Sequence, residues 1–369
     1  MLHAQDWPEL ASRFYIYAPF GQDIAGYLCK AHVAAKALDR EIVHSFDIRC
    51  GQDYLDRFRR EAPGNAVLMW GRPAERLDLL RAAIEAPCHV AVKPPLLKNH
   101  AQMAILDELI EQAVLRELVL HDASNWRYDP ALQLAAAIRK DGELLGPPQP
   151  PSPDLPTTTI SHATTLADDA DGLPCLASQG CDLVDLALWF LFSGWPSGPI
   201  VLHGARCGPQ AEGTFSLADC TTRICVQTGA ESETLVLSHL SSWATLEAGH
   251  GRDETGSIRP FVSLMPSQAD DPADLLRSAE RFCIERRYDF PGIAARLAEG
   301  RVEFVLPQDW TTDELHRRSS RLEEFVRLAM NPRHLAEDWS QRLRAKYEIS
   351  SGLLRLACEP DARRVPAVG

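Results

Sequence analysis

The segment Ala18-Pro19-Phe20-Gly21, which Gly26 follows five positions later, could bind a phosphate group. It comes directly after a short strand-like run, where a dinucleotide-binding fold has its G-x-G-x-x-G turn. Glycines serve there because a pyrophosphate must approach backbone amides at the N-terminus of a helix. Pro19, however, lacks an amide proton and Phe20 adds bulk. The segment therefore predicts either a weakened phosphate-binding turn or a plain connection between a strand and a helix.

Asp47 ends the next strand-like run, 21 positions after Gly26. An acidic residue at that place can accept hydrogen bonds from an adenosine ribose. A solvated aspartate at a strand end is an equally good interpretation. Arg49 could pair with a 2′-phosphate, so the sequence does not predict a choice between NAD and NADP.

Other polar residues also follow strand-like runs. Lys93 comes after residues 89–92, and His121 and Asn125 flank the end of a later run. Ligands of parallel sheets bind at the carboxyl ends of the strands, although a surface lysine and a capping asparagine are the alternatives. His162 and His239 lie on predicted strands further along, as ligands or as core groups.

Several kinds of chemistry find no support. Ser178 lacks a G-x-S-x-G turn, which argues against a hydrolase, and the 12 histidines form no H-E-x-x-H pair, so we expect no metal site. The ten cysteines contain no C-x-x-C, and we expect them to be free thiols.

Strands and helices that alternate along the chain between Arg13 and Lys140 must position these residues. Short hydrophobic runs alternate there with stretches of helical periodicity, which is typical of a doubly wound parallel sheet. We expect strands at residues 14–18, 41–46, 66–70, 89–92 and 118–121. Only one helix fits between Asp47 and Ala66, so the first domain is shortened.

Six prolines crowd between Gly146 and Pro156, and they predict a domain boundary because proline cannot join a helix interior or a central strand. We expect a first domain at residues 1–146, a linker at 147–156 and an α+β domain at 157–369. The second domain should contain a strand at 157–164, a helix at 180–191, β-like runs from 200 to 262, and helices at 313–330 and 335–347.

Three segments in order resemble the glucose-fructose oxidoreductase, inositol dehydrogenase and rhizopine-catabolism family, usually written Gfo/Idh/MocA. A strand ends in Val92-Lys93-Pro94, the later segment Asn125-Trp126-Arg127-Tyr128-Asp129-Pro130 follows another strand, and Gly180-Cys181-Asp182-Leu183-Val184-Asp185-Leu186-Ala187-Leu188-Trp189 resembles the G-x-H-x-x-D-L-x-x-W helix of the second domain. The resemblance implies an α/β protein: a shortened Rossmann-like domain plus an α+β domain with an open, mainly antiparallel sheet.

The resemblance also implies an NAD(P)-dependent oxidoreductase of a small polyol-, sugar- or amino-acid-derived substrate. It places Lys93 at the reacting hydroxyl or carbonyl and Asn125 near the substrate or nicotinamide. Ser178 and Asp182 stand where the family has an aspartate and a histidine, so Asp182 could replace the histidine or pair with Lys93.

The same resemblance assigns cofactor contacts to the loops after the first strands. These residues are Ala18, Phe20, Gly21, Gly26 and Asp47, together with Gly71 and Pro73, which stand in place of the family's T-P-x-x-x-H segment.

Net charge and hydropathy limit the classes of partner that we expect. The net charge of −13 argues against nucleic-acid binding, and no apolar run is long enough for a membrane span. The first residues lack the pattern of a signal peptide, so we expect a cytoplasmic protein, and by resemblance a homo-oligomer. Two other functions stay open: a small-molecule-binding or partner subunit that has lost the dinucleotide, and a non-redox lyase or cyclase that uses Lys93.

Overall fold

A computed structural model of the chain describes residues 13–21, 24–25, 45–61, 65–69, 75–122, 124–147, 156–165, 174–192, 198–218, 220–267, 271–308, 310, 314–330, 332 and 336–358. Among these residues, no helix is long and apolar enough to cross a membrane.

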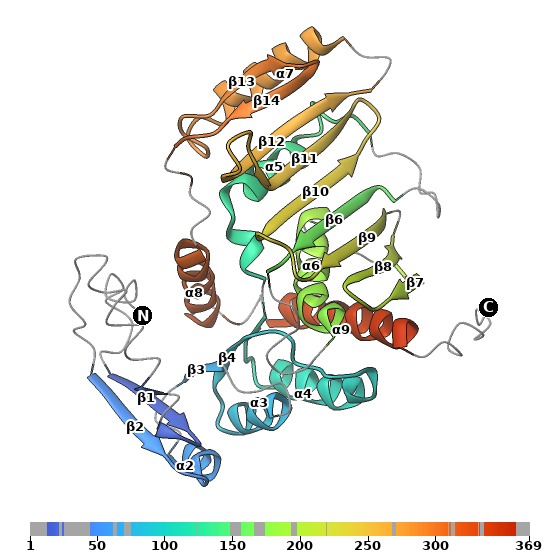
Figure 1. The fold of residues 1–369 in the computed structure, drawn as a ribbon. Helices are drawn as coiled ribbons and strands as arrows, with labels where there is room; N and C mark the ends of the chain where they lie inside the picture. The colour runs from blue at the N-terminus through green and yellow to red at the C-terminus, as the bar shows by residue number, and fades with distance from the viewer. Residues whose placement is uncertain are drawn as a thin grey trace.

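The N-terminal part contains parallel strands, as the alternating hydrophobic pattern predicts (Figure 1). β1 (Arg13–Ala18) pairs in register with β2 (Ser45–Cys50). β3 (Ala66–Met69), β4 (His89–Val92) and β5 (Leu120–His121) form a separate sheet in that order. The described strands therefore make two small parallel sheets rather than the single sheet that we expected.

The second strand ends later in the chain than predicted: its described residues are 45–50, whereas the prediction was 41–46. Residues 41–44 lie outside the described part. The strand runs on through Asp47 and Arg49 because their charges neutralise each other: Arg49 Nη2 donates to Asp47 Oδ2 at 2.8 Å. An ion pair of this kind lets polar residues continue a strand that an apolar pattern would end.

Three helices follow these strands: α2 (Tyr54–Glu61), α3 (Arg76–Glu85) and α4 (Met103–Leu115). Their apolar side chains share a core with β4 and with two residues of the C-terminal helix, Leu343 and Tyr347. The 3-10 turn η3 (Asn125–Tyr128) then leads into α5 (Pro130–Asp141). Asp129 caps α5 by accepting from the backbone amides of Ala131 and Leu132, and Gly142 ends it at a φ of 76°.

A nine-stranded sheet dominates the rest of the protein and runs in the order β13-β14-β12-β11-β10-β6-β9-β8-β7 (Figure 1). All neighbours are antiparallel except β6 and β9, so the predicted open, mainly antiparallel sheet is confirmed. The strands are β6 (Thr158–Ala163), β7 (Ile200–Arg206), β8 (Gln210–Leu217), β9 (Cys220–Gln227), β10 (Thr234–Leu240), β11 (Ala244–Arg252), β12 (Ile258–Pro266), β13 (Ala294–Ala298) and β14 (Arg301–Val305).

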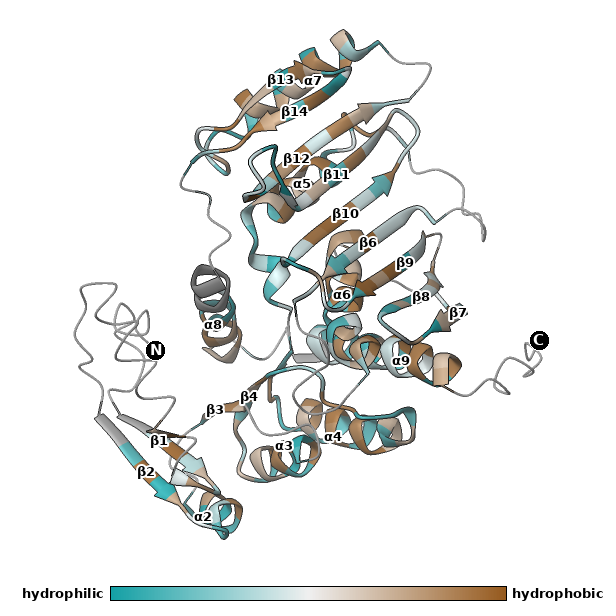
Figure 2. Cartoon of the chain, viewed as in Figure 1, coloured by the Kyte–Doolittle hydropathy of each residue, from teal (hydrophilic) through white to brown (hydrophobic). Residues whose placement is uncertain are grey.

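Helices cover one face of this sheet, namely α5, α6 (Cys175–Leu191), α7 (Pro272–Glu285) and α9 (Ala336–Cys358). Every second residue of β8 is buried against them, including Phe215 and Leu217, whereas Gln210 lies on the opposite face. Figure 2 shows these alternating brown and pale positions along the strands. Helix α6 starts five residues before the predicted Gly180 because Cys175, Leu176 and Ala177 are also buried.

The two last helices return to the N-terminal part. α8 (Glu314–Met330) packs against η3 and β4, and α9 packs against α4, β5, α6, the edge strand β7 and its neighbour β8. The predicted final helix ended at Tyr347, but α9 continues to Cys358. Ser350, Ser351 and Gly352 weaken the helical pattern in the sequence, yet burial of Ile349 and Leu353 outweighs that propensity.

Candidate active site

The carboxyl ends of β4 and β5 hold a group of charged side chains that come from both parts of the chain. Lys93 follows β4, and its backbone amide donates to Met69 O at 3.1 Å. The Lys93 side chain is exposed and has no hydrogen bond or ion pair with a described residue. An ammonium group in this position is available to a ligand.

Arg321 of α8 reaches the same strand end, where its guanidinium donates to the carbonyl oxygen of Val92. Val92 directly precedes Lys93, so this bond fixes the backbone from which the lysine projects. The sequence pattern did not single out Arg321, because a lone arginine on an amphipathic helix is usually solvated.

Asp122 follows β5 and is completely buried. Lys346 Nζ lies 3.2 Å from Asp122 Oδ1 and donates to the Asp122 carbonyl oxygen at 3.0 Å. Tyr347 Oη donates to Asp122 Oδ2 and accepts a hydrogen bond from the amide of Leu96 at 2.8 Å. Burial alone would lower the pKa of Lys346, but the Asp122 carboxylate reverses this effect and raises it. Lys346 is therefore a charged, fully buried group.

Asp182 lies on α6 near this ion pair. Its Oδ1 atom is buried and has no hydrogen-bond partner among the described residues. Burial and the Asp122 carboxylate raise the pKa of Asp182 to about 6, while Lys346 and Arg321 oppose the rise. A carboxyl group with this pKa exchanges a proton readily near neutral pH.

A second buried ion pair ties α6 to η3. Arg127 Nε donates to Asp185 Oδ2 at 2.6 Å, and the amide of Ser124 donates to the same oxygen at 2.7 Å. Burial would raise the pKa of Asp185, but the Arg127 guanidinium outweighs it and lowers the pKa to about 2. This pair is structural, because every oxygen of the carboxylate is engaged.

Asn125 begins η3, next to that ion pair. Its Oδ1 atom is buried and unpartnered among the described residues, as Asp182 Oδ1 is. Buried polar atoms of folded proteins nearly always find a partner, so two such oxygens favour a bound ligand or water.

His121 ends β5 and is completely buried. Its Nε2 atom lies 3.1 Å from Glu324 Oε2 of α8, and Tyr128 donates its hydroxyl to the same oxygen. Burial lowers the pKa of His121 despite the neighbouring Glu324. The Trp339 ring of α9 packs on the imidazole with ring centroids 4.7 Å apart.

The structure brings only some of the predicted site residues together. Asn125 and Asp182 lie on adjoining elements, since Asp185 of the same α6 binds η3. No contact between Lys93 and Asp182 is described, so the predicted pairing of the two is not seen. Ser178 is buried on α6, and its hydroxyl donates to the carbonyl of Cys175.

The residues predicted to contact the cofactor lie mainly after β1. Phe20 is 52% exposed, and a Cβ added to Gly21 would meet only Cys50 Sγ at 4.0 Å. Residues 21, 24 and 25 are helical, so a helix begins directly after the turn. Gly26, Gly71 and Pro73 lie outside the described residues.

Asp47 is the third residue of β2 and does not end the strand, contrary to the sequence prediction. The actual carboxyl end is followed by Gly51, which has a φ of 148°, and by Asp53. The Asp53 carbonyl accepts the first hydrogen bond of α2, from Arg57. An acidic side chain therefore does stand beyond the end of β2, six residues after the predicted one.

His162 and His239 lie on strands β6 and β10, as predicted. His162 Nε2 lies 3.3 Å from Glu233 Oε1, and its ring packs edge-on against Trp126. His239 Nδ1 lies 2.9 Å from the hydroxyl of Thr158, and burial lowers its pKa to about 4. Both histidines thus have core partners.

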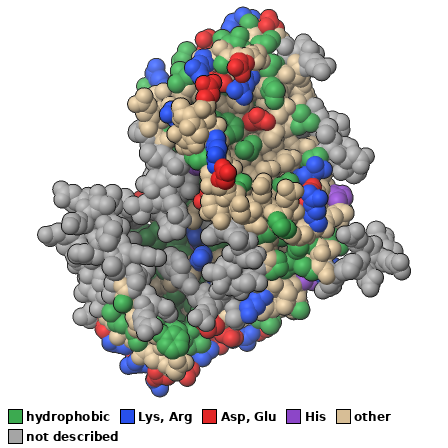
Figure 3. All heavy atoms as spheres, viewed as in Figure 1, with side chains coloured by type: hydrophobic (Ala, Val, Ile, Leu, Met, Phe, Trp, Pro, Cys, Tyr) green, Lys and Arg blue, Asp and Glu red, His purple; other side chains and the backbone are tan. Residues whose placement is uncertain are grey.

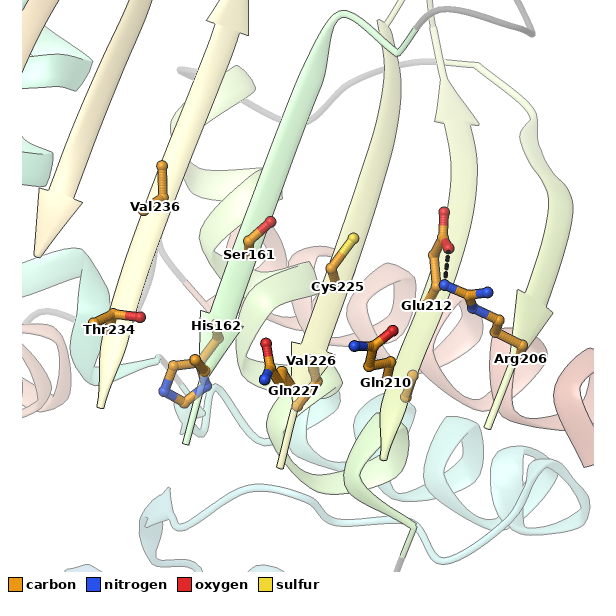
Figure 4. A pocket seen from close by; sticks show the side chains of 12 residues that line it. Ser161, His162, Arg206, Gln210, Glu212, Cys225, Val226, Gln227, Thr234 and Val236 are labelled. Atoms are coloured by element: carbon orange, nitrogen blue, oxygen red, sulfur yellow. Dashed lines mark ion pairs between the residues drawn. The ribbon is translucent and has the colours of Figure 1, made fainter. Parts of the chain in front are cut away.

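A separate hollow of about 350 Å³ lies on the nine-stranded sheet. Figure 4 shows the ends of neighbouring strands beneath it, with Gln210, Gln227, Cys225 and the ion-paired Glu212 and Arg206. Of the residues that the sequence predicted to be functional, only His162 lines it. Figure 3 shows Lys and Arg side chains within a recess on one face of the molecule.

Four charged or polar residues of the site were missed: Arg321, Glu324, Lys346 and Tyr347. One hint was present, because Lys346 lies three residues after Leu343 and three before Ile349, on the apolar side of a helix. A lysine on such a side predicts a buried partner.

Comparisons with known proteins give the same fold. No protein-family model and no curated protein matches the sequence. A solved structure of a protein from Parabacteroides merdae ATCC 43184, described as an oxidoreductase, has a TM-score of 0.84 at 16% identity and covers 98% of this chain and 95% of its own.

Two further structures are similar. The 3-ketoreductase KijD10 from Actinomadura kijaniata, in complex with NADP and TDP-benzene, has a TM-score of 0.58 at 12% identity, and the match covers 96% of this chain and 90% of that one. The UDP-N-acetylglucosamine 3-dehydrogenase GnnA from Acidithiobacillus ferrooxidans has a TM-score of 0.56 at 14% identity, with 96% and 94% covered. The chain therefore has the two-domain fold of the Gfo/Idh/MocA-type oxidoreductases, as its sequence motifs predicted.

Proposed function

We propose that the protein is an NAD(P)-dependent oxidoreductase that interconverts a hydroxyl and a carbonyl group on a small polyol-, sugar- or amino-acid-derived substrate. The observation that carries this proposal is the pair of buried oxygens without a described partner, Asn125 Oδ1 on η3 and Asp182 Oδ1 on the adjoining helix α6. The similar structures support it, because KijD10 is bound to NADP and GnnA is a dehydrogenase.

A nicotinamide dinucleotide suits the residues that follow the N-terminal parallel strands. The unpartnered Asn125 Oδ1 could accept from an amide such as the carboxamide of nicotinamide. The helix start at Gly21 would face the pyrophosphate. On the adenosine side we propose Asp53 rather than Asp47, because Asp53 stands beyond the carboxyl end of β2 while Asp47 is bound to Arg49.

When bound, NAD(P) supplies or accepts the hydride. The protein's own groups handle the proton and the position of the substrate. Lys93 would hydrogen-bond the reacting oxygen, and Asp182, with its pKa of about 6, would take or release the proton at neutral pH. Arg321 would position Lys93 through its bond to the Val92 carbonyl.

The test is calorimetry of the full chain with NAD and with NADP, followed by a screen of polyols, sugars and amino-acid derivatives for reduction of the bound form. Binding of one dinucleotide with a dissociation constant below about 1 mM, corresponding to roughly −4 kcal/mol, is the expected result. A folded protein that gives no heat with either dinucleotide overturns the proposal.

One observation favours a second function, a small-molecule-binding subunit without the dinucleotide. Pro19 has no amide proton to offer, and the half-exposed Phe20 occupies the turn that should cradle phosphate. Native mass spectrometry of the purified chain distinguishes the two, because a retained NAD(P) excludes the second function.

We further propose a homo-oligomer, formed through the sheet face that the helices leave uncovered. Strands of that face carry exposed apolar side chains, including Val201 on the edge strand β7 and Met265 on β12. Light scattering coupled to gel filtration should give a mass that is a multiple of the 40.9 kDa chain.

A further inference from the structure

Two cysteines that are far apart in the sequence meet at the surface. Cys207 follows β7, Cys358 ends α9, and their sulfur atoms lie 3.6 Å apart although 151 positions separate them. Both residues are exposed. Neither belongs to the candidate active site.

The backbone around this pair is closely packed. A Cβ on Gly352 would meet Leu202 Cδ1 of β7 at 2.5 Å, and a Cβ on Gly213 of β8 would meet Leu353 Cδ1 at 2.7 Å. These two glycines let the last turns of α9 lie directly on β7 and β8, as Figure 1 shows for the red helix beside β7. The close approach of the sulfur atoms therefore follows from tight docking of the helix.

We propose that Cys207 and Cys358 form a reversible disulfide that fastens the end of α9 to the edge of the nine-stranded sheet. A disulfide needs its sulfur atoms about 2.05 Å apart, so each must move by less than 1 Å, which small side-chain rotations provide.

A low-molecular-weight disulfide such as oxidised glutathione supplies the oxidising equivalents. The thiolate of Cys358 attacks one glutathione sulfur, forms a mixed disulfide and releases one glutathione thiol. The thiolate of Cys207 then attacks the Cys358 sulfur and releases the second glutathione thiol. The two protein thiols lose two electrons and two protons, and the glutathione disulfide gains both.

The second step should depend on pH. Partial burial and, in the reduced protein, the neighbouring Cys358 thiol raise the pKa of Cys207 to about 12, so little Cys207 thiolate is present at neutral pH. Ring closure should accordingly accelerate about tenfold for each pH unit between 7 and 9, in proportion to the thiolate fraction.

The disulfide would act on the same helix that supports the active site. α9 carries Lys346 and Tyr347, which bind Asp122, twelve and eleven residues before Cys358. A fastened C-terminus suppresses fraying of the helix, and a cross-link across a long loop stabilises the fold against unfolding. Oxidation should therefore protect α9 without altering the charges around Asp122.

The experiment treats the reduced full chain with oxidised glutathione at pH 8, blocks the remaining thiols and maps disulfide-linked peptides by mass spectrometry. Hydrogen exchange of residues 336–358 and the melting temperature are measured before and after oxidation, and again after dithiothreitol. Cys207→Ser and Cys358→Ser are compared with Cys175→Ser, because Cys175 is a third cysteine near Cys207 and its thiol donates to the Gly208 carbonyl at 3.6 Å.

The expected result is a peptide cross-linked through Cys207 and Cys358 in the parent chain and in Cys175→Ser, but in neither of the other variants. Oxidation should raise the melting temperature by about 5 °C or more, with slower exchange in α9, and dithiothreitol should reverse both. A glutathione adduct that stays on Cys358 without closing, or a cross-link between two chains, overturns the proposal. These results do not depend on whether the protein binds NAD(P).

Discussion

Lys346 Nζ lies 3.2 Å from Asp122 Oδ1, with both side chains almost completely buried, although the residues are 224 positions apart. The pair connects the end of β5 in the N-terminal part with the last helix of the chain. Because Asp182 has its unpartnered oxygen nearby, the C-terminal helix both joins the two parts and sets the charge around the candidate active site.

The first prediction concerns this ion pair. Lys346→Met should lower the free energy of unfolding by about 3–5 kcal/mol, because it leaves the Asp122 carboxylate buried without its cation. Urea unfolding followed by circular dichroism measures the change. Lys140→Met, at an exposed position of α5, is the control and should change stability by less than about 0.5 kcal/mol. A loss in Lys346→Met as small as that of the control would show that water reaches Asp122.

The second prediction concerns the pH dependence that Asp182 introduces. Its folded pKa of about 6 lies above the ordinary value of 3.8, so the folded protein holds this proton more tightly than the unfolded chain. The protonated carboxyl group contributes its full stabilisation of the folded state below pH 4. This contribution is lost as the pH rises through 6, and the loss in the free energy of unfolding is on the order of 3 kcal/mol in total. Asp182→Asn removes this loss, so the variant should gain stability relative to the parent between pH 4 and 6.

Urea unfolding at several pH values measures that gain. Asp289→Asn, at an exposed position, serves as the control. A parallel pH dependence in the parent and in Asp182→Asn would mean that Asp182 is solvated and ionises normally.

The third prediction concerns the Arg127–Asp185 pair, for which the sign is opposite. Arg127 lowers the pKa of Asp185 to about 2, so its stabilisation is present above pH 3.8 and is lost as the pH falls through 2. Asp185→Ala should cost about 3–5 kcal/mol at pH 7, because the Arg127 charge stays buried. A double-mutant cycle with Arg127→Met should recover part of this cost; strict additivity of the two losses would contradict the coupling.

A fourth prediction tests the turn after β1. Phe20→Gly should bind NAD(P) more tightly than the parent, because it removes a half-exposed ring and leaves a residue that permits close approach to backbone amides. Calorimetry measures the dissociation constants for NAD and NADP. Phe20→Leu is the matched variant: it keeps an apolar side chain and should bind as the parent does. Equal affinity in all three proteins would separate this turn from the cofactor.

The sequence predicts those parts of the fold that rest on local patterns. The strand at residues 89–92 has the bounds of β4, because a continuous apolar run between polar residues admits only one buried strand there. The end of α9 was missed, because its serines and Gly352 are poor helix formers and only packing on β7 and β8 keeps them helical.

Only some residues of the candidate site could be predicted from the sequence. Asn125, Asp182 and Lys93 follow strands or lie in motifs, so their places could be inferred from the chain around them. Arg321 and Lys346 reach the site from helices more than 130 residues further along, and no local pattern reports which strand end a helix will meet. The proximity of Cys207 and Cys358 could not be predicted for the same reason, because the two residues are far apart in the sequence.

The last prediction separates catalysis by Lys93 from its effect on stability. The Lys93 side chain is exposed and has no described partner, so Lys93→Met should leave the melting temperature unchanged. Turnover of any substrate found in the screen should fall by about 10²–10³-fold, which is the usual cost of removing one hydrogen-bond donor to the reacting oxygen. Lys98→Met, five residues further along the same loop, should keep turnover within about twofold of the parent because Lys98 does not adjoin the Arg321-anchored carbonyl of Val92. If Lys93→Met and Lys98→Met both turn over substrate as fast as the parent, Lys93 has no role in the mechanism. If both lose turnover equally, the substrate requires positive charge on the loop rather than an ammonium group at one position.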